Sequence, residues 1–521
     1  MVQSIQSPTI QSPAQANLYT LFASRFPEDI SRTFIEIPTG RTCSFRDLGK
    51  ETARFANILV GMLGLREGDR IAVSVEKSPE AIFLYLACLR SGIIYLPLNT
   101  AYQPSEIDYF LSDAEPKAIV CRPEAFPGIS KLAMQHGIGQ VLTLSGQGTG
   151  TFPGLSKNAT ASADSVFDTV PCGEDDVAAI LYTSGTTGRP KGAMLTHGNL
   201  ASNALALHEA WQWTSSDVLL HALPLFHAHG LFVACHGALW SGARMILLPR
   251  FDESSVLAQL PRTTVFMGVP TYYTRLLAER DFSEKNCKSM RLFISGSAPL
   301  SETTFHAFRE RTGHTILERY GMTETLMNTS NAYNGKRKAG SVGLALPGVS
   351  VRVVNETGEE KVGDIQIKGP NVFKGYWHLP EKTAEEFTPD GWFRTGDLGK
   401  TDEDGYLFIV GRGKDLIITG GYNVYPREVE RVLDSLPGVQ ESAVIGIPNT
   451  DYGEMVIAIV VREPEHEQNG EAVTEEGILS ALKQTIANYK APKRVLFAKD
   501  FPRNAMGKIQ KNLLREEYAA S

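Results

Sequence analysis

Tyr182-Thr-Ser-Gly-Thr-Thr-Gly-Arg-Pro-Lys-Gly192 is the most informative stretch of the chain, and it directly follows the apolar run Val177-Ala-Ala-Ile-Leu181. Its glycines allow tight turns and let backbone N–H groups approach an anion, while hydroxyls, an arginine and a lysine add further donors. This combination predicts a loop that holds a polyphosphate. The stretch is not a Walker A loop, because Pro190 precedes Lys191 and Gly192 follows it. The residues alone leave a second interpretation open, a Gly/Thr hairpin between two strands.

The composition is typical of a large globular protein. At 521 residues the chain is longer than one hydrophobic core normally supports, so at least two domains are expected. Its formal net charge of −7 argues against a nucleic-acid-binding protein, which would present a basic surface. One region departs from this balance, since residues 490–515 contain eight lysines and arginines and a single acidic residue, Asp500. This region fits either a solvated basic surface or a mobile element that meets polyanions.

Cysteines and apolar stretches indicate the compartment. Six cysteines are scattered without a C-x-x-C pair, which favours buried thiols in a reducing compartment over a disulfide framework. The first 17 residues lack the basic and apolar regions of a signal peptide. The one long apolar stretch, residues 218–240, contains Pro224 and four histidines, so it is predicted to form a pocket wall rather than a membrane span. We therefore expect a cytoplasmic protein with no membrane partner.

Short apolar strands alternate with helical patterns along most of the chain. Residues 70–75 are typical of a strand, Ser78-Pro79 of a helix start, and Gly92 of the end of that helix. Further buried strands are expected at residues 93–98, 118–121, 244–248, 264–267 and 291–294. The pattern predicts an α/β architecture built on wound sheets.

Five more blocks follow the glycine-rich loop: Tyr320-Gly-Met-Thr-Glu324, Trp392-Phe-Arg-Thr-Gly-Asp397, Gly411-Arg-Gly-Lys-Asp415, Gly420-Gly-Tyr-Asn-Val-Tyr-Pro426 and Pro502-Arg-Asn-Ala-Met-Gly-Lys508. Together with the loop, they resemble in kind and order the signatures of the AMP-forming acyl-CoA synthetases of the adenylate-forming superfamily. The resemblance covers nearly the whole chain.

The resemblance implies two domains. Residues 1–413 would form a large N-terminal domain of wound α/β sheets plus a distorted barrel, which holds the ATP and acyl sites. Residues 414–521 would form a small, mobile α+β domain that carries a catalytic lysine and completes the CoA half-reaction. The hinge would lie at Lys414.

The resemblance also implies a nucleotide site. Tyr320 would lie against adenine, Thr323 on the α-phosphate, and Asp397 and Arg412 on the ribose. Without it, a polar turn after a strand at residues 315–317 and ordinary turn chemistry at Asp397 explain these blocks as well. The full set expected to bind ATP is Thr183, Ser184, Gly185, Thr186, Thr187, Gly188, Lys191, Gly296, Ser297, Ala298, Glu318, Arg319, Tyr320, Gly321, Met322, Thr323, Asp397, Arg412 and Lys508.

The expected catalytic residues follow from the same resemblance. In the family, the lysine at the Lys508 position swings into the site and bridges the substrate carboxylate and the α-phosphate. A cation supplied as the carboxylate attacks phosphorus stabilises the anionic transition state more than the ground state. Thr183 and Glu324 would hold Mg²⁺, a hard cation that prefers oxygen ligands. The catalytic set is Lys508, His227, Thr183 and Glu324, and the residues expected to bind CoA are Gly420, Gly421 and Tyr422.

A histidine cluster lies within residues 218–240. His221, His227, His229, Cys235 and His236 invite a zinc interpretation, but their spacing fits no zinc pattern well. The resemblance places His227 beside the acyl pocket, with His229 a weaker candidate. The other two histidines are expected to serve packing.

The identity of the acid depends on the acyl pocket. The phrases around residues 268–275, 291–300 and 318–325 look closest to the malonyl-CoA synthetase subgroup, which uses an arginine at the Arg275 position and a serine matching Ser297 to hold a distal carboxylate. An arginine fork matches a carboxylate and would be a poor neighbour for a fatty tail. A surface arginine is the alternative. The residues expected to bind the acid are Arg275, Ser297, His227, His229 and Met322.

The sequence therefore predicts a ligase that converts malonate, ATP and CoA into malonyl-CoA, AMP and pyrophosphate, with methylmalonate as a second acid. Other short- or medium-chain acyl-CoA synthetases are the nearest alternative. A luciferase-like oxygenase or a carrier-protein ligase is less favoured. An inactive nucleotide-binding protein would be expected to lose Lys191, Glu324 or Lys508, and all three are present. We expect a monomer or homodimer.

Overall fold

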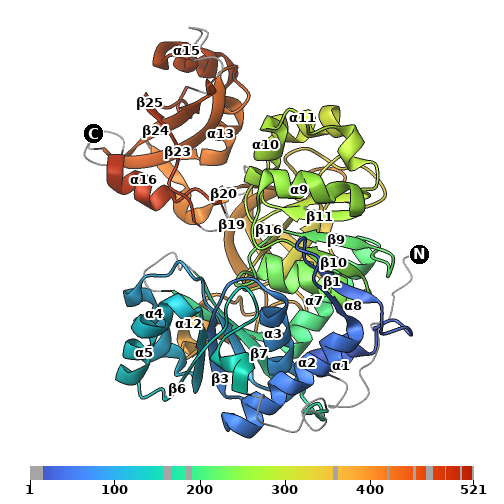
Figure 1. Cartoon of the computed structure of the whole chain (residues 1–521). Helices are drawn as coiled ribbons and strands as arrows, with labels where there is room; N and C mark the ends of the chain where they lie inside the picture. The colour runs from blue at the N-terminus through green and yellow to red at the C-terminus, as the bar shows by residue number, and fades with distance from the viewer. Residues whose placement is uncertain are drawn as a thin grey trace.

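The computed structural model describes residues 16–155, 166–183, 190–355, 362–419, 422–449, 453–464, 473–486, 488–504 and 507–518. Two large sheets covered by helices make up most of the molecule, and a group of elements from the C-terminal end stands apart from them (Figure 1). The strands β19 and β20 lie between the large sheets and this group (Figure 1).

One large sheet has seven strands in the order β18-β8-β7-β4-β3-β5-β6, and its pairing is parallel from β7 to β6. The hairpin β7-β8 is antiparallel and carries the glycine-rich loop between its strands. The bounds are β3 Arg70–Ser74, β4 Ile94–Pro97, β5 Ala118–Cys121, β6 Gln140–Thr143, β7 Val177–Thr183, β8 Lys191–Thr196 and β18 Gly375–Tyr376.

The other large sheet has nine strands in the order β15-β14-β13-β12-β11-β9-β10-β1-β2, and it is parallel from β13 to β1. Parallel strands end at a common edge, where open α/β sheets bind their ligands. The bounds are β1 Thr33–Glu36, β2 Thr42–Ser44, β9 Val218–His221, β10 Arg244–Leu247, β11 Val265–Gly268, β12 Leu292–Ser295, β13 Leu317–Met322, β14 Leu326–Ser330 and β15 Leu344–Ala345.

Helices cover both large sheets (Figure 1). Around the first sheet and the junction they are α1 Leu18–Ala23, α2 Phe45–Asn57, η2 Ile58–Met62, α3 Pro79–Ser91, α4 Pro104–Ala114, η3 Pro123–Ala125, α5 Phe126–Gln135, α6 Thr151–Gly154 and α7 His197–Ala210. Those that follow are η5 His229–Cys235, α8 His236–Trp240, α9 Glu253–Gln259, η6 Leu260–Arg262, α10 Pro270–Ala278, η7 Glu284–Cys287, α11 Glu302–Thr312 and α12 Pro380–Glu385.

Two smaller sheets complete the molecule. The order β16-β17-β19-β20 is fully antiparallel, with bounds β16 Ser350–Val354, β17 Gly363–Lys368, β19 Phe393–Thr401 and β20 Leu407–Arg412. The last sheet has the order β22-β21-β24-β23, with β25 paired to β24. Its elements are η8 Gly413–Asp415, β21 Ile417–Thr419, β22 Tyr422–Val424, α13 Pro426–Leu433, β23 Val439–Asn449, β24 Gly453–Arg462, α15 Glu475–Thr485, β25 Arg494–Ala498 and α16 Lys511–Tyr518.

The predicted α/β architecture of wound sheets is confirmed, with a smaller C-terminal unit. The predicted helix after residue 78 is α3, whose N-cap is the Ser78 hydroxyl and whose last turn ends at Gly92 in the left-handed region. Two apolar clusters, one between Ile417 and Val495 and one between Ala443 and Leu514, contain only residues from this last part of the chain. The boundary proposed at residues 413 and 414 stays a prediction.

The strand expected at residues 315–317 was placed wrongly, and the turn considered as an alternative for Asp397 is a strand. The strand expected at residues 315–317 runs instead from Leu317 to Met322, so Tyr320 lies in a strand and not in the turn after it. Antiparallel pairing with β14 extends it, and Gly321 is needed there because a Cβ would lie 1.9 Å from the Leu326 carbonyl oxygen. Asp397 likewise lies within β19, where it pairs with β20, rather than in a turn.

Over the described part of the chain, no helix combines the length and apolar character that crossing a membrane requires.

Candidate active site

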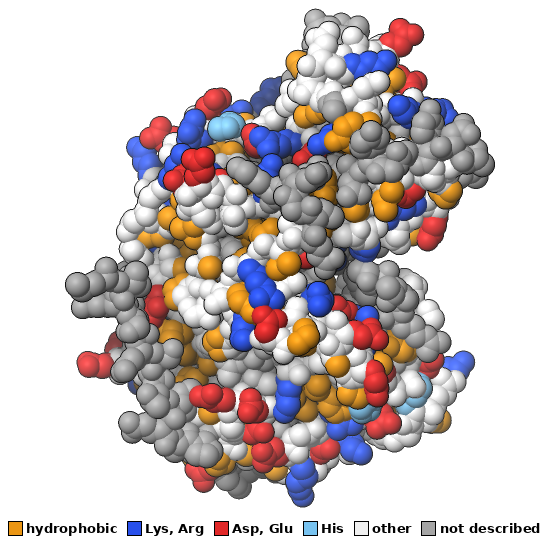
Figure 2. Space-filling model, turned by 180° about the vertical axis from the view of Figure 1, so that it is seen from behind, with side chains coloured by type: hydrophobic (Ala, Val, Ile, Leu, Met, Phe, Trp, Pro, Cys, Tyr) orange, Lys and Arg blue, Asp and Glu red, His pale blue; other side chains and the backbone are white. Residues whose placement is uncertain are grey.

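A cavity of about 2170 Å³ lies between the C-terminal sheet and the rest of the molecule. The space-filling view shows a notch between these two parts from behind (Figure 2). The sequence-predicted residues that line the cavity are Thr183, Lys191, His227, His229, Arg275, Ser297, Ala298, Glu318, Arg319, Tyr320, Gly321, Met322, Thr323, Glu324, Asp397, Arg412, Lys414 and Lys508. The predicted residues Ser184, Gly185, Thr186, Thr187, Gly188, Gly420 and Gly421 and the Tyr422 side chain lie outside the described residues.

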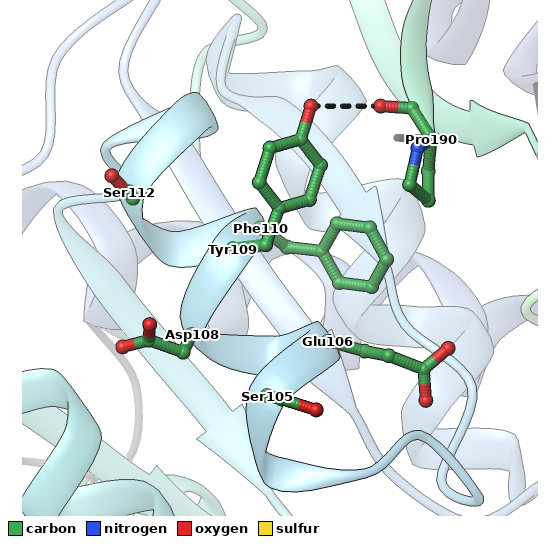
Figure 3. Close-up of a pocket in the computed structure, with 7 residues that line it drawn as sticks. All are labelled: Ser105, Glu106, Asp108, Tyr109, Phe110, Ser112 and Pro190. Carbon is green, nitrogen blue, oxygen red and sulfur yellow. Dashed lines mark hydrogen bonds between the residues drawn. The ribbon is translucent and has the colours of Figure 1, made fainter. Parts of the chain in front are cut away.

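The ends of the glycine-rich loop are fixed by strand pairing and by α4. Thr183 ends β7 and pairs with Lys191 at the start of β8, so a strand follows the loop. The Tyr109 hydroxyl of α4 donates a hydrogen bond of 2.8 Å to the Pro190 carbonyl oxygen, beside a small hollow of about 350 Å³ (Figure 3). These contacts hold the loop's last residue against the sheet.

Lys191 lies in a chain of polar contacts that ends at Glu324. Its Nζ is 3.4 Å from Glu386 Oε1 and 4.0 Å from the centre of the Tyr376 ring. The Tyr376 hydroxyl donates a hydrogen bond of 3.1 Å to Glu324 Oε1. Burial raises the pKa of the Glu324 carboxyl above its ordinary value. The loop lysine and the proposed metal-binding carboxylate are therefore held by the same tyrosine.

Asp397 is held by the residues expected beside it. The Tyr320 hydroxyl donates a hydrogen bond of 2.5 Å to Asp397 Oδ2, and the Arg412 Nε is 3.0 Å from Asp397 Oδ1. The register of β19 and β20 places Asp397 directly opposite Arg412. An aromatic ring, a carboxylate and a guanidinium thus meet at one end of the cavity, which suits the base and sugar of a nucleotide.

Lys508 lines this cavity from the segment between β25 and α16. It follows Gly507, whose φ is +74° and where a Cβ would lie 3.0 Å from the Thr271 Oγ1 of α10. Burial, and then the charge of Arg412, lower the pKa of the Lys508 ammonium to about 8. The expected catalytic lysine therefore lies close enough to Asp397 and Arg412 for their charges to act on it, and a glycine lets its loop approach α10.

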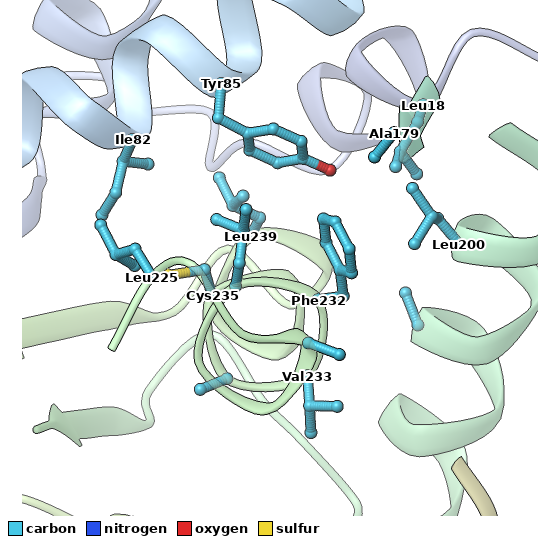
Figure 4. Packing of buried hydrophobic residues seen from close by; sticks show 14 of the residues in the cluster. Leu18, Ile82, Tyr85, Ala179, Leu200, Leu225, Phe232, Val233, Cys235 and Leu239 are labelled. Atoms are coloured by element: carbon cyan, nitrogen blue, oxygen red, sulfur yellow. The ribbon is translucent and has the colours of Figure 1, made fainter. Parts of the chain in front are cut away.

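The segment that carries the histidines is folded back on itself in the core. Lys77 Nζ donates to the carbonyl oxygens of His221 and Leu223, each at 2.8 Å, and contacts His221 Nδ1 at 2.7 Å. Gly230 is required nearby, since a Cβ would lie 2.0 Å from the Pro224 carbonyl oxygen. The π-helix η5 that follows packs Phe232 and Cys235 beneath Tyr85 of α3 (Figure 4). The predicted pocket wall therefore rests on a rigid base.

Each histidine of this segment has its own contact. His236 Nε2 lies 2.8 Å from the Tyr85 hydroxyl, and His221 Nε2 lies 2.9 Å from the Gly230 carbonyl oxygen, so these two serve packing. The His229 backbone N–H donates to His227 Nδ1 at 3.2 Å. Burial lowers the pKa of His227 to about 4, so it is neutral near pH 7.

Ser297 and His229 form a contact on the cavity wall. The Ser297 Oγ lies 3.2 Å from His229 Nδ1, and Ser297 has a φ of +73°, an unusual backbone conformation for a residue with a side chain. His229 was the weaker of the two sequence candidates, yet it is the histidine that contacts the predicted acid-binding serine.

Arg275 lines the cavity, and its guanidinium is paired with a carboxylate of the protein, that of Glu253. It lies in the last turn of α10, pairs with the Glu253 carboxylate, and stacks 5.1 Å above the Phe251 ring. Its side chain is 56% exposed. The helix α10 begins at Pro270. The contact of Arg275 with an acid stays a prediction.

Glu318 and Arg319, both expected at the nucleotide, are buried at the base of the cavity. Glu318 Oε1 accepts a hydrogen bond of 3.0 Å from the Leu300 backbone N–H, and burial raises the pKa of this carboxyl to about 7. Three residues that hold site residues in place were not among the sequence candidates: Lys77, Tyr376 and Glu386. Of the three, only Tyr376 has a sequence signal, since it lies in the aromatic run Phe373-Lys-Gly-Tyr-Trp377. In the structure its ring packs against Phe373.

Residues 21–377 match the model of the AMP-binding enzyme family, and residues 428–508 match the model of the AMP-binding enzyme C-terminal domain. The chain belongs to the AMP-binding enzyme family. It is an AMP-forming acyl-CoA ligase.

Relatives of known activity span several acids. The chain is 52% identical to ATP-bound MatB from Rhodopseudomonas palustris, with a TM-score of 0.92 over 97% of this chain and 99% of that one. It is 35% identical to a malonate–CoA ligase of Arabidopsis thaliana, over 90% of this chain and 80% of the relative. It is also 35% identical to a feruloyl-CoA synthase of an Amycolatopsis species, over 92% of this chain and 94% of the relative. The ligase class is thus shared, whereas the acid differs among relatives.

Proposed function

We propose that this chain joins malonate to CoA, using ATP and releasing AMP and pyrophosphate through a malonyl-adenylate, and that it also accepts methylmalonate. The observation that carries the proposal is the 35% identity to a malonate–CoA ligase of Arabidopsis thaliana over 90% of this chain. The 52% identity across nearly the full length of both chains to MatB, a protein whose structure holds ATP, supports the use of ATP. A feruloyl-CoA synthase at similar identity keeps another acyl-CoA synthetase as the alternative.

The nucleotide half of the proposal assigns roles to the paired residues. Asp397 would accept from the ribose hydroxyls, with Arg412 and Tyr320 orienting it. The donor set at Glu324 fits Mg²⁺, because a buried carboxylate with one oxygen held by Tyr376 and the Thr183 hydroxyl are both oxygen ligands. When bound there, the ion would neutralise charge on the polyphosphate.

Lys508 would supply the cation of the first half-reaction. The carboxylate oxygen of the acid attacks the α-phosphorus, the bond to pyrophosphate breaks, and negative charge accumulates on the phosphoryl oxygens. The Lys508 ammonium, which lies close enough to Asp397 and Arg412 for their charges to affect its pKa, would stabilise that charge. Thioester formation would then require Lys508 to leave and the residues near Tyr422 to approach, by rotation at Lys414.

The acid would bind near His227, His229, Ser297 and Arg275, which all line the cavity and of which Ser297 and His229 are in contact. Arg275 would pair with the distal carboxylate after exchanging its partner Glu253. Since its side chain is largely exposed, this exchange costs little desolvation.

The test is acid-dependent release of pyrophosphate over acetate, butyrate, malonate, methylmalonate, succinate, octanoate, benzoate and ferulate. Malonate should give the highest kcat/KM. A higher value for ferulate or octanoate would replace the proposed acid while leaving the ligase class intact.

Arg275→Ala sharpens this test. The variant should lose about ten- to hundredfold in kcat/KM for malonate, because a charged hydrogen-bonding partner is removed, and should lose much less for butyrate. Arg280→Ala is the matched control, since Arg280 is an exposed arginine just beyond the same helix and lies outside the cavity lining. Equal losses for both acids would leave Arg275 with a structural role only.

A further inference from the structure

Lys77 links the two large sheets. It lies in the short connection between β3 of the seven-stranded sheet and α3, next to Ser78, the N-cap of that helix. Its Nζ donates hydrogen bonds of 2.8 Å to the carbonyl oxygens of His221 and Leu223, and it lies 2.7 Å from His221 Nδ1. His221 is the last residue of β9 in the nine-stranded sheet. One lysine from the first sheet therefore makes three contacts at the end of a strand of the second.

The ring of His221 connects this lysine to Gly230. Its Nε2 lies 2.9 Å from the Gly230 carbonyl oxygen, and because a carbonyl oxygen only accepts, Nε2 carries the proton. Burial, and then the charge of Lys77, lower the pKa of His221, so the ring is neutral and its Nδ1 is an acceptor. Three acceptors then surround the Lys77 Nζ, and only an ammonium has three N–H groups to donate to them.

Gly230 carries the link to the cavity wall. Its N–H donates a hydrogen bond of 3.1 Å to the His227 carbonyl oxygen, so its carbonyl is held by His221 and its N–H by His227. The His229 N–H donates to His227 Nδ1 at 3.2 Å. The contacts therefore run from Lys77 through His221 and Gly230 to the two histidines that line the cavity.

The wall segment, residues 226–229, depends on such contacts for its position. All four residues line the cavity, whereas neither Lys77 nor His221 does. Residues 222–227 lie between β9 and η5 and belong to neither, so no strand pairing holds them in place. A shift of about 1 Å in a group beside the reacting atoms can lower a rate by about 10²-fold. Residues outside the cavity therefore help to set the geometry inside it.

We propose that Lys77 is a positioning residue for the adenylation step, and that through His221 and Gly230 it holds the wall segment in place beside the acid. This inference rests on the proposed function only in that the acid binds near His227 and His229, and it does not depend on which acid that is. Lys77 itself lies outside the cavity lining. Its loss should therefore impair use of the acid and leave the binding of ATP unchanged.

The experiment measures pyrophosphate release by the full-length chain, with kcat/KM for malonate at saturating ATP and KM for ATP at saturating malonate. Lys77→Met keeps an unbranched stem and removes all three donors. It should lower kcat/KM for malonate by about ten- to hundredfold without raising KM for ATP. Lys77→Gln, which keeps two N–H donors but no charge, should recover part of this loss.

Tyr85→Phe is the matched control. The Tyr85 hydroxyl lies 2.8 Å from Nε2 of His236, which follows Cys235 in the core that packs beneath the Tyr85 ring (Figure 4). Neither Tyr85 nor His236 lines the cavity. The substitution removes a buried hydrogen bond from the same folded-back segment, so it should lower the temperature of thermal unfolding and leave kcat/KM for malonate unchanged.

His221→Phe tests the route of the effect. If Lys77 acts through His221, the double variant Lys77→Met/His221→Phe should have about the same kcat/KM for malonate as Lys77→Met alone, because residues that act as one unit are not additive. Additive losses in the double variant would show that the two residues act separately and would overturn the route.

The remaining outcomes separate positioning from packing and from the function. A KM for ATP raised as much as kcat/KM for malonate falls, or an equal loss in Tyr85→Phe, would leave Lys77 with a structural role only. If Lys77→Met does not fold, as judged by thermal unfolding, Lys77→Gln decides: a lower kcat/KM for malonate than in Tyr85→Phe supports the inference, and an equal value overturns it. If wild type prefers another acid to malonate, the proposed function fails, and the same comparisons made with that acid test Lys77.

Discussion

The two ends of the cavity differ in how their charges are satisfied. At the end proposed to bind the nucleotide, Asp397 is held by Tyr320 and Arg412, and Lys191 by Glu386. At the end proposed to bind the acid, Arg275 pairs with Glu253, but Arg319 and His229 keep buried nitrogen atoms with no partner among the described residues. The second end therefore offers buried hydrogen-bond donors that the protein itself leaves unpaired.

This difference indicates where discrimination between acids arises. Residues that are already paired present the same geometry to ATP whichever acid is bound. An acid that forms hydrogen bonds with unpaired buried donors binds more tightly, whereas an acid that cannot do so leaves them unpaired and binds more weakly. Such donors discriminate between acids more strongly than the shape of an apolar pocket does. If the paired end acts in the same way on every acid, changes to its residues should affect malonate and butyrate equally.

The largest effect is expected for Lys508→Ala. Because Lys508 would stabilise charge that develops only during attack on phosphorus, formation of the acyl-adenylate should fall by about 10²-fold or more. Thioester formation from supplied malonyl-AMP should be largely retained. The measurement is single-turnover pyrophosphate release beside CoA-dependent consumption of the adenylate. Equal loss in both half-reactions, or a loss with malonate but not butyrate, would contradict the assignment of Lys508 to the shared chemistry.

Lys414→Pro should affect the second half-reaction. Lys414 lies in the short turn η8, next to Asp415, which pairs with Arg515 of the C-terminal helix at 2.7 Å. Proline restricts φ at this position and should hinder rotation between the two parts. Adenylation should persist while transfer to CoA slows by about tenfold or more, for malonate and butyrate alike. Wild-type rates in both half-reactions would show that no rotation at this residue is needed.

The pH dependence of adenylation tests the environment of Lys508. Its pKa is lowered to about 8 by burial and by Arg412, so the ammonium is charged below that pH and neutral above it. The kcat/KM for adenylation should therefore fall as pH rises through about 8, by about tenfold per unit beyond it. CoA transfer from supplied malonyl-AMP should lack this fall. An adenylation rate that keeps rising to pH 9 would be inconsistent with a required Lys508 ammonium.

Much of the fold could be read from local patterns. The helix from Pro79 to Ser91 carries its own start and stop, a serine cap, a proline and a terminal glycine, so its limits needed no tertiary information. The strand containing Tyr320 was missed in part because its residues are polar. It is defined by pairing with Leu326–Ser330 and by the close approach that Gly321 permits, and neither is visible in a hydrophobic pattern.

The sequence identified many of the residues that line the cavity, but not the contacts that hold them in place. Asp397 and Arg412 each belong to a sequence block that resembles the family. Their positions opposite each other depend on the pairing of β19 with β20. Lys77 contacts His221 and Tyr376 contacts Glu324, and both contacts join segments that are remote in sequence. Motif spacing therefore could not predict them.

The smallest effect is expected for Tyr376→Phe. The phenyl ring keeps the face that lies beneath Lys191 Nζ and removes only the hydroxyl that donates to Glu324. One such hydrogen bond contributes about 0.5–1.5 kcal/mol, so kcat/KM for ATP should fall about three- to tenfold and the Mg²⁺ concentration needed for half-maximal rate should rise. The ratio of malonate to butyrate should not change, because Glu324 belongs to the paired end. Tyr406→Phe is the matched control, since its hydroxyl donates to the Lys336 carbonyl oxygen away from the polyphosphate. A changed acid ratio in Tyr376→Phe would show that the two ends of the cavity are coupled rather than separate.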